Sequence, residues 1–598
     1  MSQTKAPEKI RNIAIIAHID HGKTTLVDAL LKGTDSMRRS DLGKERLMDS
    51  DKQEQERGIT IFAKPTSVCY QDYKINFIDT PGHGDFSGEV QRMLGLVQGV
   101  LLIVDAREGP MPQTRYVMRE ALKRGIHPIV VVNKVDRPHS TPWESVDKVF
   151  DLMTELGASD SQLDFKTCFT SAILGKSGMD PDDLSDSMNP LIDLIISTVK
   201  PPEGKLEDPF CLQVVTTGYN LYFGTTLCGR VLSGKVKVGM RLAWKDKTGK
   251  RLKGTVAHVR TPIGTERVDV EEIGAGDVVE IDGLEGAGVG DTLYEDVQGA
   301  ELERLDFIEV DEPTLFAQVK ANFSPFAGKE GDKVTYTAVR DRLLLESRSN
   351  ISLTVRQSDG SKETLEVGGR GELHLAVVFE TMRREGYELC VGEPSVVTKE
   401  IDGVLHEPWE VAEIIVMEDT AGWIIEQLTQ RGGELKNLVK DDEGRQHMTW
   451  EIAMERLLGL RSQLQQVSRG QAQLFSRHLD FRPVQAEKKL SGNGLLISMD
   501  TGRATGYSLV QLQKRGRLFI EVGTEVYKKM ALGINARPGD LEVNPTKAKQ
   551  LTNFRTQNKD EALKIEPPLP LTLEYALELM GSGQWIELTP KSIRIFKV

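Results

Sequence analysis

Hydrophobic residues in the first 200 positions gather into short runs that show no polar alternation. The runs are IRNIAIIAH, KINFIDT, VLLIVDA, HPIVVVNKVD and TCFTSA. Parallel strands that are buried on both faces have this pattern, and segments of helical periodicity lie between the runs. This succession of strands and helices predicts a doubly wound α/β domain over residues 1–202, with its ligand at the carboxyl ends of the strands.

The pattern changes after KPPEGKLEDP, a stretch with Pro and Gly that ends the first domain. Pro and Gly at this density favour loops over regular elements. Short strands punctuated by glycine follow, among them GRVLSGKVKVG, EIGAGDVVEIDGL and VGDTL. This spacing predicts a small antiparallel β-barrel over residues 203–302.

A helical stripe marks the third domain, which we place at residues 303–392. Leu375, Val378, Phe379 and Met382 follow the i, i+3, i+4, i+7 rule within ELHLAVVFETMRREG. Apolar residues at this spacing line one face of an α-helix. The segment therefore predicts an amphipathic helix in a domain of mixed α/β structure.

Two further segments complete the predicted architecture. Residues 393–481 form a second α/β unit, whose helix runs through AGWIIEQLTQ and ends at Gly432 and Gly433 because glycine terminates helices. Residues 482–598 are dominated by strand and turn patterns and contain no repeat. We therefore expect a multidomain α/β chain with a mostly β C-terminal domain.

Composition narrows the class of protein. The chain has 598 residues, and its 39% apolar and 28% charged residues suit a globular protein with several cores. It has no run approaching about 18 apolar residues, and MSQTKAPEKIRNIAII lacks the apolar core of a signal peptide. Five scattered cysteines without a CxxC pair argue against a zinc site and favour a reducing compartment. We expect a cytoplasmic protein that does not enter a membrane.

Charge is unevenly distributed along the chain. The net charge is −13, which disfavours a general nucleic-acid binder. Residues 482–598, however, contain 18 Lys and Arg against 12 Asp and Glu, an excess of +6 that leaves −19 on the rest of the chain. This asymmetry predicts a basic contact module attached to an acidic body.

The strongest chemical signal lies where the first apolar run meets a helix, at AHIDHGKTT. A loop between a buried strand and a helix N-terminus offers backbone N–H groups that cradle phosphates. Lys23 would reach the β- and γ-phosphates, and the Thr24 hydroxyl would bind Mg²⁺. A chance Gly-Lys-Thr is the alternative, which the flanking strand and helix argue against. The nucleotide-binding residues predicted here are Asp20, His21, Gly22, Lys23, Thr24 and Thr25.

Two more segments predict a switch around the phosphates. Asp79 ends the strand KINFIDT, where a carboxylate is a natural outer partner of Mg²⁺. Gly82 has no side chain, so its N–H can approach the γ-phosphate closely. Thr60, within RGITI, is placed to close on Mg²⁺ when a γ-phosphate is present. An ordinary junction between a loop and a strand is the alternative for each segment taken alone.

Base specificity is predicted by Asn133-Lys134-Val135-Asp136, which follows the run HPIVVV. Guanine presents N1–H and N2–H₂ on one edge, and a single carboxylate can accept both, whereas adenine lacks these donors. A buried Asp136 would be left poorly paired by ATP, a penalty of a few kcal/mol. Ser171 and Ala172, after another strand, would add a backbone contact to the guanine O6. The motif narrows the prediction from a nucleoside triphosphatase to a GTPase.

Together these motifs resemble those of the ribosome-binding translational GTPases. AHIDHGKTT, RGITI, DTPGHGDF and NKVDR carry the resemblance in the first domain, and VGGRGELHL and EPWEVAEIIV carry it in later ones. Only a few residues separate GYELCVGEPSVVTKEIDG from EPWE, where elongation factor G has a long additional domain. The tail segments VYKKMALGINARPGDLEVNPTKAKQLTN and LTLEYALELM are similar to the C-terminal domain of the BipA/TypA family. The resemblance to that family covers essentially the whole chain.

The resemblance implies a P-loop GTPase domain, a β-barrel, two ferredoxin-like α+β domains and a mostly β C-terminal domain. It implies ribosome-stimulated hydrolysis of GTP to GDP and phosphate, in translation under stress or in ribosomal subunit assembly. GTP or GDP and Mg²⁺ are the implied ligands. The implied partners are the ribosome, through rRNA and tRNA, or a subunit precursor, and the chain is expected to be a monomer.

By position, the resemblance implies that His83 is the catalytic residue, which orients the attacking water. Ile19 and Ile59 would form an apolar gate between His83 and the γ-phosphate. Asp20 would help to hold a monovalent cation or the loop. From the residues alone, a solvent-facing turn histidine is an equal alternative for His83.

The tail predicts contacts with RNA. Lys547, Lys549 and Arg555 lie in a predicted loop beside Phe554, and positive charge next to an aromatic ring suits an RNA backbone and an unstacked base. A solvated basic surface is the alternative. This loop and MERLLGLRSQL both lack a glycine that is usual in the family. A switch for a non-ribosomal partner, an assembly factor for ribosome precursors and an organellar origin stay open.

Overall fold

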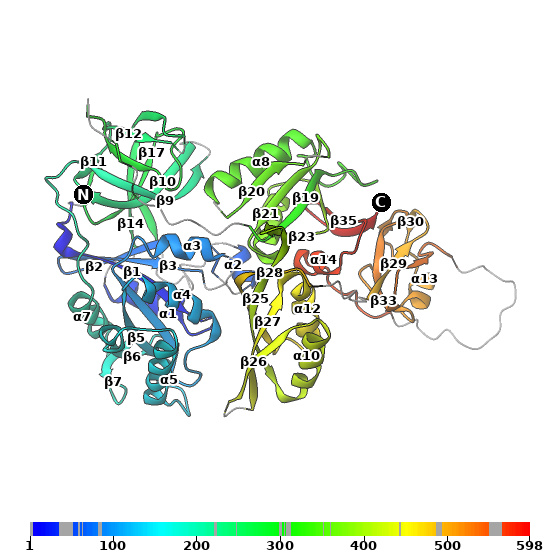
Figure 1. Ribbon diagram of the computed structural model, residues 1–598, viewed down its shortest axis with the longest axis horizontal. Helices are drawn as coiled ribbons and strands as arrows, with labels where there is room; N and C mark the ends of the chain where they lie inside the picture. The colour runs from blue at the N-terminus through cyan, green and yellow to red at the C-terminus, as the bar shows by residue number, and fades with distance from the viewer. Residues whose placement is uncertain are drawn as a thin grey trace. The chain divides into compact units, whose positions relative to one another are not determined.

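The computed structural model describes the chain in sixteen stretches. They are residues 4–18, 20–34, 52–57, 60–61, 64–81, 86–220, 224–246, 248–297, 302–303, 305, 313–350, 352–358, 360–441, 444–485, 493–548 and 565–598. The chain forms two compact units, residues 1–311 with 348–351 and residues 312–347 with 352–598. Figure 1 shows both units and labels many of their helices and strands.

An eight-stranded mixed sheet forms the N-terminal half of the first unit. Its strands are β1 (Ile10–Ala17), β2 (Pro65–Tyr70), β3 (Tyr73–Asp79), β4 (Gly99–Asp105), β5 (His127–Asn133), β6 (Lys166–Ser171), β7 (Lys176–Asp180) and β8 (Asp183–Ser185). They lie in the order β2-β3-β1-β4-β5-β6-β7-β8, and the five from β3 to β6 are parallel. These five strands are the five apolar runs, so the predicted doubly wound sheet is confirmed.

Helices cover both faces of this sheet. They are α1 (Lys23–Gly33), α2 (Lys52–Arg57), α3 (Ser87–Met93), α4 (Pro112–Lys123), α5 (Pro142–Glu155), α6 (Asp160–Leu163) and α7 (Asn189–Thr198). In β1, Ala14 and Ile16 enter a core with α3, α4 and α5, whereas Ile13 and Ile15 enter a second core with α1 and α7. Because successive side chains point to opposite faces, a strand buried on both sides shows no polar alternation.

An antiparallel sheet that curls around one core follows in the same unit. Its strands are β9 (Cys211–Asn220), β10 (Gly224–Ser233), β12 (Arg241–Lys245), β13 (Arg251–Thr255), β14 (His258–Ile263), β15 (Glu266–Asp269), β17 (Val278–Asp282) and β18 (Thr292–Glu295). The strand order is β13-β12-β18-β9-β10-β17-β14-β15, and β11 (Lys235–Lys237) pairs separately with β16 (Glu272–Gly274). Trp244 is fully buried in the core. This is the predicted barrel-like domain.

A buried polar seam joins this barrel to the first sheet. Lys74 Nζ lies 2.8 Å from Asp277 Oδ2 and donates to Thr261 Oγ1 at 2.5 Å. Asn76 Nδ2 donates to Asp277 Oδ1 at 3.0 Å and to Asn12 Oδ1 at 2.8 Å. All five residues are buried. Since buried polar groups are tolerated when they are hydrogen-bonded, the seam fixes the barrel to β1 and β3.

The sheet of the third domain also contains the last two strands of the whole chain. The sheet contains β19 (Leu315–Ala321), β20 (Thr354–Gln357), β21 (Leu365–Gly369), β22 (Leu389–Gly392), β23 (Ser395–Val396), β35 (Gln584–Leu588) and β36 (Ile593–Lys597). The strand order is β20-β21-β19-β22-β35-β36, with β23 also paired to β19. The sequence pattern predicted neither the position of β35 nor that of β36 in this sheet.

The helices that enter the core of this sheet include α8 (Tyr336–Ser349), α9 (Glu372–Arg384) and α14 (Leu573–Leu579). In α9, Leu375, Val378, Phe379 and Met382 are all buried. The predicted amphipathic helix is therefore confirmed. Its apolar stripe faces a core that the C-terminal helix α14 also enters.

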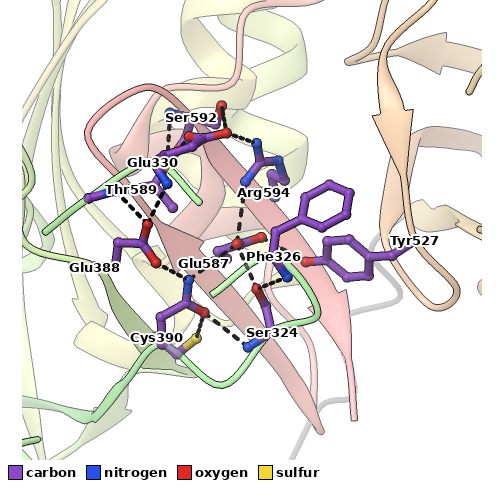
Figure 2. A network of polar contacts seen from close by, with 12 residues as sticks. Ser324, Phe326, Glu330, Glu388, Cys390, Tyr527, Glu587, Thr589, Ser592 and Arg594 are labelled. Carbon is purple, nitrogen blue, oxygen red and sulfur yellow. Dashed lines mark hydrogen bonds and ion pairs between the residues drawn. The ribbon is translucent and has the colours of Figure 1, made fainter. Parts of the chain in front are cut away.

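Figure 2 shows a polar network where β22 meets β35. Glu388, just before β22, is fully buried and accepts hydrogen bonds from the N–H groups of Gly328, Glu330 and Gly331 at 2.7–2.9 Å. Asn322 Nδ2 donates to the same carboxylate at 2.9 Å. Burial alone would raise the pKa of Glu388, but these four donors hold it below its ordinary value.

Glu587 of β35 forms the second half of the network and is also fully buried. It accepts hydrogen bonds from Ser324 Oγ at 2.6 Å and from Tyr527 OH at 2.9 Å, and it lies 3.3 Å from Arg594 Nη1. Tyr527 belongs to the C-terminal domain. Glu587 thus ties that domain to the sheet of the third domain.

The next sheet consists of β24 (Lys399–Ile401), β25 (Val404–Met417), β26 (Glu434–Lys440), β27 (Arg445–Ala453) and β28 (Gln473–Pro483). Its strand order is β24-β25-β27-β26, and β28 pairs with β25. The associated helices are α10 (Glu418–Gln430), α11 (Met454–Leu457) and α12 (Leu460–Val467). Gly432 has a φ of 78° just after α10, so the predicted helix and its glycine stop are confirmed.

The C-terminal domain contains β29 (Asn493–Ser498), β30 (Gly502–Arg503), β31 (Gly516–Leu518), β32 (Glu525–Val526), β33 (Ala531–Pro538), β34 (Leu541–Val543) and α13 (Gly506–Leu512). Four of these strands form a sheet in the order β31-β33-β29-β34, and β30 pairs with β32. The domain is mostly β, as predicted. Across the described ranges, no helix has the length and apolar character that crossing a membrane requires.

Candidate nucleotide-binding site

The loop between β1 and α1 takes a left-handed backbone conformation at two residues. Asp20 has a φ of 64° and Gly22 a φ of 91°, and α1 begins at Lys23. A Cβ on residue 22 would lie 2.4 Å from Asn133 Nδ2, so the position requires glycine. The loop therefore turns tightly into a helix N-terminus, which is the backbone arrangement that binds phosphate.

Three residues predicted to serve the phosphates and Mg²⁺ converge beside this loop. Lys23 Nζ lies 2.6 Å from Asp79 Oδ1 and donates a hydrogen bond to Thr60 Oγ1. Asp79 ends β3, and its side chain is 4% exposed. Thr24 follows Lys23 in the first turn of α1 and is half-buried. Residues from three separate segments of the sequence are thus brought to one point.

The oxygen atoms gathered here fit Mg²⁺ in kind. Thr24 and Thr60 offer hydroxyls and Asp79 offers a carboxylate, and Mg²⁺ prefers hard oxygen ligands combined with phosphate oxygens and water. No group of three or more His, Cys, Asp or Glu that could hold a metal lies within the described residues.

Asn133 links the base-recognition motif to two other loops. Its Nδ2 donates to the carbonyl oxygen of His21 at 2.9 Å. Its Oδ1 accepts from Thr170 Oγ1 at 3.0 Å and from the backbone N–H of Ala172 at 3.1 Å. Ser171 is fully buried between them. The structure thus brings the predicted Ser171 and Ala172 next to Asn133 and the phosphate loop.

Lys134 is held by an aspartate that sequence reasoning missed. Its Nζ lies 2.8 Å from Asp105 Oδ2 and donates to the carbonyl oxygen of Asp20. Asp105 ends β4, is almost fully buried and also lies 3.7 Å from Arg137. The signal that could have found Asp105 is an acidic residue at the end of a buried apolar run, which is the signal that identified Asp79.

Asp136 lies exposed in the turn after β5, and the sequence-based prediction that it is buried is therefore wrong. The turn leaves the sheet, so neighbouring side chains do not cover the carboxylate. Its oxygens are therefore accessible to the edge of a purine. The low-polarity surroundings that penalise adenine would have to come from the bound base itself.

Several predicted site residues fall outside the described residues: Ile19, Ile59, Gly82, His83, Lys549 and Arg555. Their predicted roles stay predictions. Thr25 is exposed in the first turn of α1. Lys547 is exposed in the C-terminal domain, and its carbonyl oxygen accepts a hydrogen bond at 2.6 Å from Thr505, the residue that caps α13.

Four known domain families match successive segments of the chain. They are the elongation factor Tu GTP binding domain at residues 8–201, elongation factor Tu domain 2 at residues 224–294, the elongation factor G C-terminus at residues 404–491 and the TypA/BipA C-terminal domain at residues 493–598. The first match covers the loop, strands and motifs described above.

Curated relatives match along nearly the whole chain. The large ribosomal subunit assembly factor BipA of Synechocystis sp. is 45% identical over 589 residues, which are 98% of this chain and 98% of the relative. The protein of the same name from Escherichia coli (strain K12) is 44% identical over 593 residues, 99% of this chain and 97% of the relative. A crystal structure from Thermus thermophilus superposes with a TM-score of 0.54 at 16% identity, over 80% of this chain and 98% of that one, and shares the fold.

Proposed function

We propose, from the premise that this chain belongs to the BipA/TypA family of translational GTPases, that it acts on the ribosome as a GTP-driven switch. The chain is a GTP-hydrolysing enzyme with an elongation-factor GTP-binding domain. Its relatives are named as assembly factors of the large ribosomal subunit, and we extend that role to this chain. The convergence of Lys23, Thr60 and Asp79 at the phosphate loop carries the proposal.

In the proposed site, Lys23 binds the β- and γ-phosphates, while Asn133 and Asp136 select the guanine base. Asp136 accepts the two donors on the guanine edge, and the backbone of Ser171 and Ala172 adds a contact to O6. The bond from Asn133 to the carbonyl of His21 supports this arrangement because it ties the base-binding loop to the phosphate loop. One set of contacts would thus fix both ends of GTP.

Thr60 and Asp79 are proposed to respond to the γ-phosphate. Lys23 contacts both residues, so a phosphate that draws the lysine changes the surroundings of both. Mg²⁺, held by Thr24, Thr60 and Asp79, would neutralise the charge that develops on the phosphates. The segment with Thr60 would close around GTP and open after hydrolysis, as in other γ-phosphate switches.

His83 is proposed to orient the attacking water, with Ile19 and Ile59 as the apolar gate. GTPases of this class without assistance turn over at about 10⁻⁴ to 10⁻² s⁻¹. We therefore expect slow intrinsic hydrolysis and strong stimulation when ribosomal RNA aligns His83. Lys547, Lys549 and Arg555 in the basic tail would contact rRNA or tRNA. The proposed working form is a monomer in the cytoplasm.

Sedimentation tests the proposed partner. The full chain is mixed with whole ribosomes, with separated subunits and with large-subunit precursors, in GDP or in a non-hydrolysable GTP analogue. We expect co-sedimentation with large-subunit particles in the analogue and little in GDP. A chain that binds the analogue but sediments with none of these particles would be a switch for a non-ribosomal partner.

A histidine substitution tests the proposed chemistry. His83→Ala should lose at least about 100-fold of the ribosome-stimulated rate, the scale of a lost proton-transfer or water-positioning group, and should still co-sediment in the GTP analogue. His127→Ala, at an exposed histidine at the start of β5, is the matched control. A His83→Ala protein that ribosomes stimulate to the normal rate would remove His83 from its role.

A further inference from the structure

The side chain of His21 is fully buried beneath the phosphate loop, with polar groups at both ring nitrogens. Nε2 lies 3.3 Å from Glu108 Oε2. Nδ1 lies 3.4 Å from the carbonyl oxygen of Ile103 and 3.4 Å from the backbone nitrogen of Asp105. All three partners belong to the end of β4 and the turn that follows it. The ring thus joins the phosphate loop to a segment of the chain in which no GTP ligand was predicted.

The turn that carries Glu108 is tightly built. Gly109 has a φ of 75°, and its N–H donates to the carbonyl oxygen of Asp105 at 3.0 Å. The N–H of Arg107 donates to Asp105 Oδ1 at 2.8 Å. The side chain of Glu108 is 36% exposed, so one side of its carboxylate meets water while the other meets the ring. A fixed turn therefore presents the carboxylate to His21.

The carboxylate favours a proton on the ring nitrogen that faces it. A carboxylate beside Nε2 favours Nε2–H, because an unprotonated Nε2 would place its lone pair against the negative oxygen of Glu108. With Nε2 protonated, Nδ1 can accept from the N–H of Asp105. The ring of His18 lies edge-on at 5.1 Å between centroids and restricts the space for a different ring position.

We propose that Glu108 is a positioning residue for the phosphate loop. It holds the ring of His21 in place, while Asn133 holds the carbonyl of the same residue at 2.9 Å. Together they fix residue 21 from two sides and so keep the backbone N–H groups of the loop aimed at the phosphates. Without Glu108 the buried Nε2 would lose the carboxylate that lies 3.3 Å away, and movement of the ring towards another polar group would carry the loop with it. This inference rests on the proposed GTP site.

The dissociation of fluorescent nucleotide tests the inference in the full chain. Glu108→Gln keeps the size of the side chain and removes its charge. The rate constants for release of mant-GDP and of mant-GTP should both rise about tenfold, because the contacts that the loop makes are common to the two nucleotides. The KM for GTP should rise with a smaller change in kcat, as for a lost interaction that ground state and transition state share.

A double-mutant cycle separates positioning through His21 from a general structural effect. If Glu108 acts through the ring, the double variant of Glu108→Gln and His21→Gln releases nucleotide no faster than His21→Gln alone. Effects that multiply would overturn the inference. Glu144→Gln, at an exposed glutamate in the first turn of α5, is the matched control and should release nucleotide at the wild-type rate.

Failure of the positioning role of Glu108 and failure of the proposed GTP site give different results. If the wild-type chain retains guanine nucleotide and Glu108→Gln releases it at the wild-type rate, the positioning role is wrong and the proposed GTP site stands. If the wild-type chain itself binds no guanine nucleotide, the proposed site fails and the positioning role fails with it.

Discussion

Lys23 Nζ lies 2.6 Å from Asp79 Oδ1, which joins the lysine of the phosphate loop to the carboxylate at the end of β3. Lys23 also donates a hydrogen bond to the hydroxyl of Thr60. Because Asp79 is almost completely buried, its charge depends on Lys23 for compensation. A ligand phosphate that attracts Lys23 would therefore change the surroundings of the Asp79 carboxylate.

The first prediction concerns Lys23. Lys23→Met removes the proposed phosphate ligand and the cation beside Asp79, and we expect the affinity for GTP to fall about 100-fold, the equivalent of ~3 kcal/mol for a charged hydrogen bond. Equilibrium titration with fluorescent GTP measures the loss. Lys32→Met, at an exposed lysine of the same helix α1, should bind GTP normally. Equal affinities for the two variants would contradict the assignment.

The second prediction concerns the seam between the first sheet and the barrel. Lys74→Met leaves the buried carboxylate of Asp277 without its cation, which should lower the free energy of unfolding of this unit by about 3–5 kcal/mol. Urea unfolding followed by tryptophan fluorescence, to which Trp244 in the barrel core contributes, reports the loss. Lys253→Met, which breaks an exposed pair in the same barrel, should cost less than about 1 kcal/mol. Similar losses in both variants would mean that the seam contributes no more than a surface pair.

The third prediction is a pH dependence of the second unit. The pKa of Glu388 is lower in the folded chain than its ordinary value, so its contribution is complete above the unfolded pKa of about 4.3 and is lost as the pH falls through the folded pKa. The midpoint temperature of thermal unfolding should therefore fall when the pH is lowered below about 5. Glu388→Gln should reduce stability at neutral pH. It should also make the midpoint temperature less dependent on pH in this acid range, the acid limb of the stability curve. An acid limb that keeps its slope in Glu388→Gln would exclude Glu388 as its origin.

The fourth prediction concerns the tie between the C-terminal domain and the third domain. Tyr527→Phe removes a hydrogen bond of 2.9 Å to the fully buried Glu587, and the carboxylate that stays behind loses a donor at a cost of about 1–3 kcal/mol. Differential scanning calorimetry should show a lower unfolding temperature for the second unit. Tyr507→Phe, at an exposed tyrosine on α13, should leave it unchanged. An unaltered midpoint in Tyr527→Phe would show that the network does not stabilise the tie.

The first sheet and its phosphate loop could be predicted because their signals are local. A strand buried on both faces needs an unbroken apolar run, and a helix that packs on a core needs a stripe such as Leu375 to Met382. The loop and its lysine are contiguous in sequence, and the strand before them and the helix after them were what favoured a phosphate loop over a chance Gly-Lys-Thr. These features could be predicted because each depends on residues that lie close together in the sequence.

The remaining features depend on contacts between distant segments. The pairing of β22 with β35 joins residues near 390 to residues near 586, and no periodicity in either segment records its partner. Glu388 and Glu587 look like ordinary surface glutamates in the sequence, although both are fully buried in the structure. The role of Glu108 is hidden for the same reason, because its partner His21 lies on another strand-to-helix connection.

The most direct test of the account is the nucleotide specificity of Asp136. Equilibrium titrations with GTP, ATP and XTP are compared for the wild-type chain and for Asp136→Asn. The wild-type chain should prefer GTP over ATP by about 100-fold or more, and Asp136→Asn should shift the preference towards XTP. Equal affinities of the wild-type chain for GTP and ATP would contradict the claim that this carboxylate reads guanine.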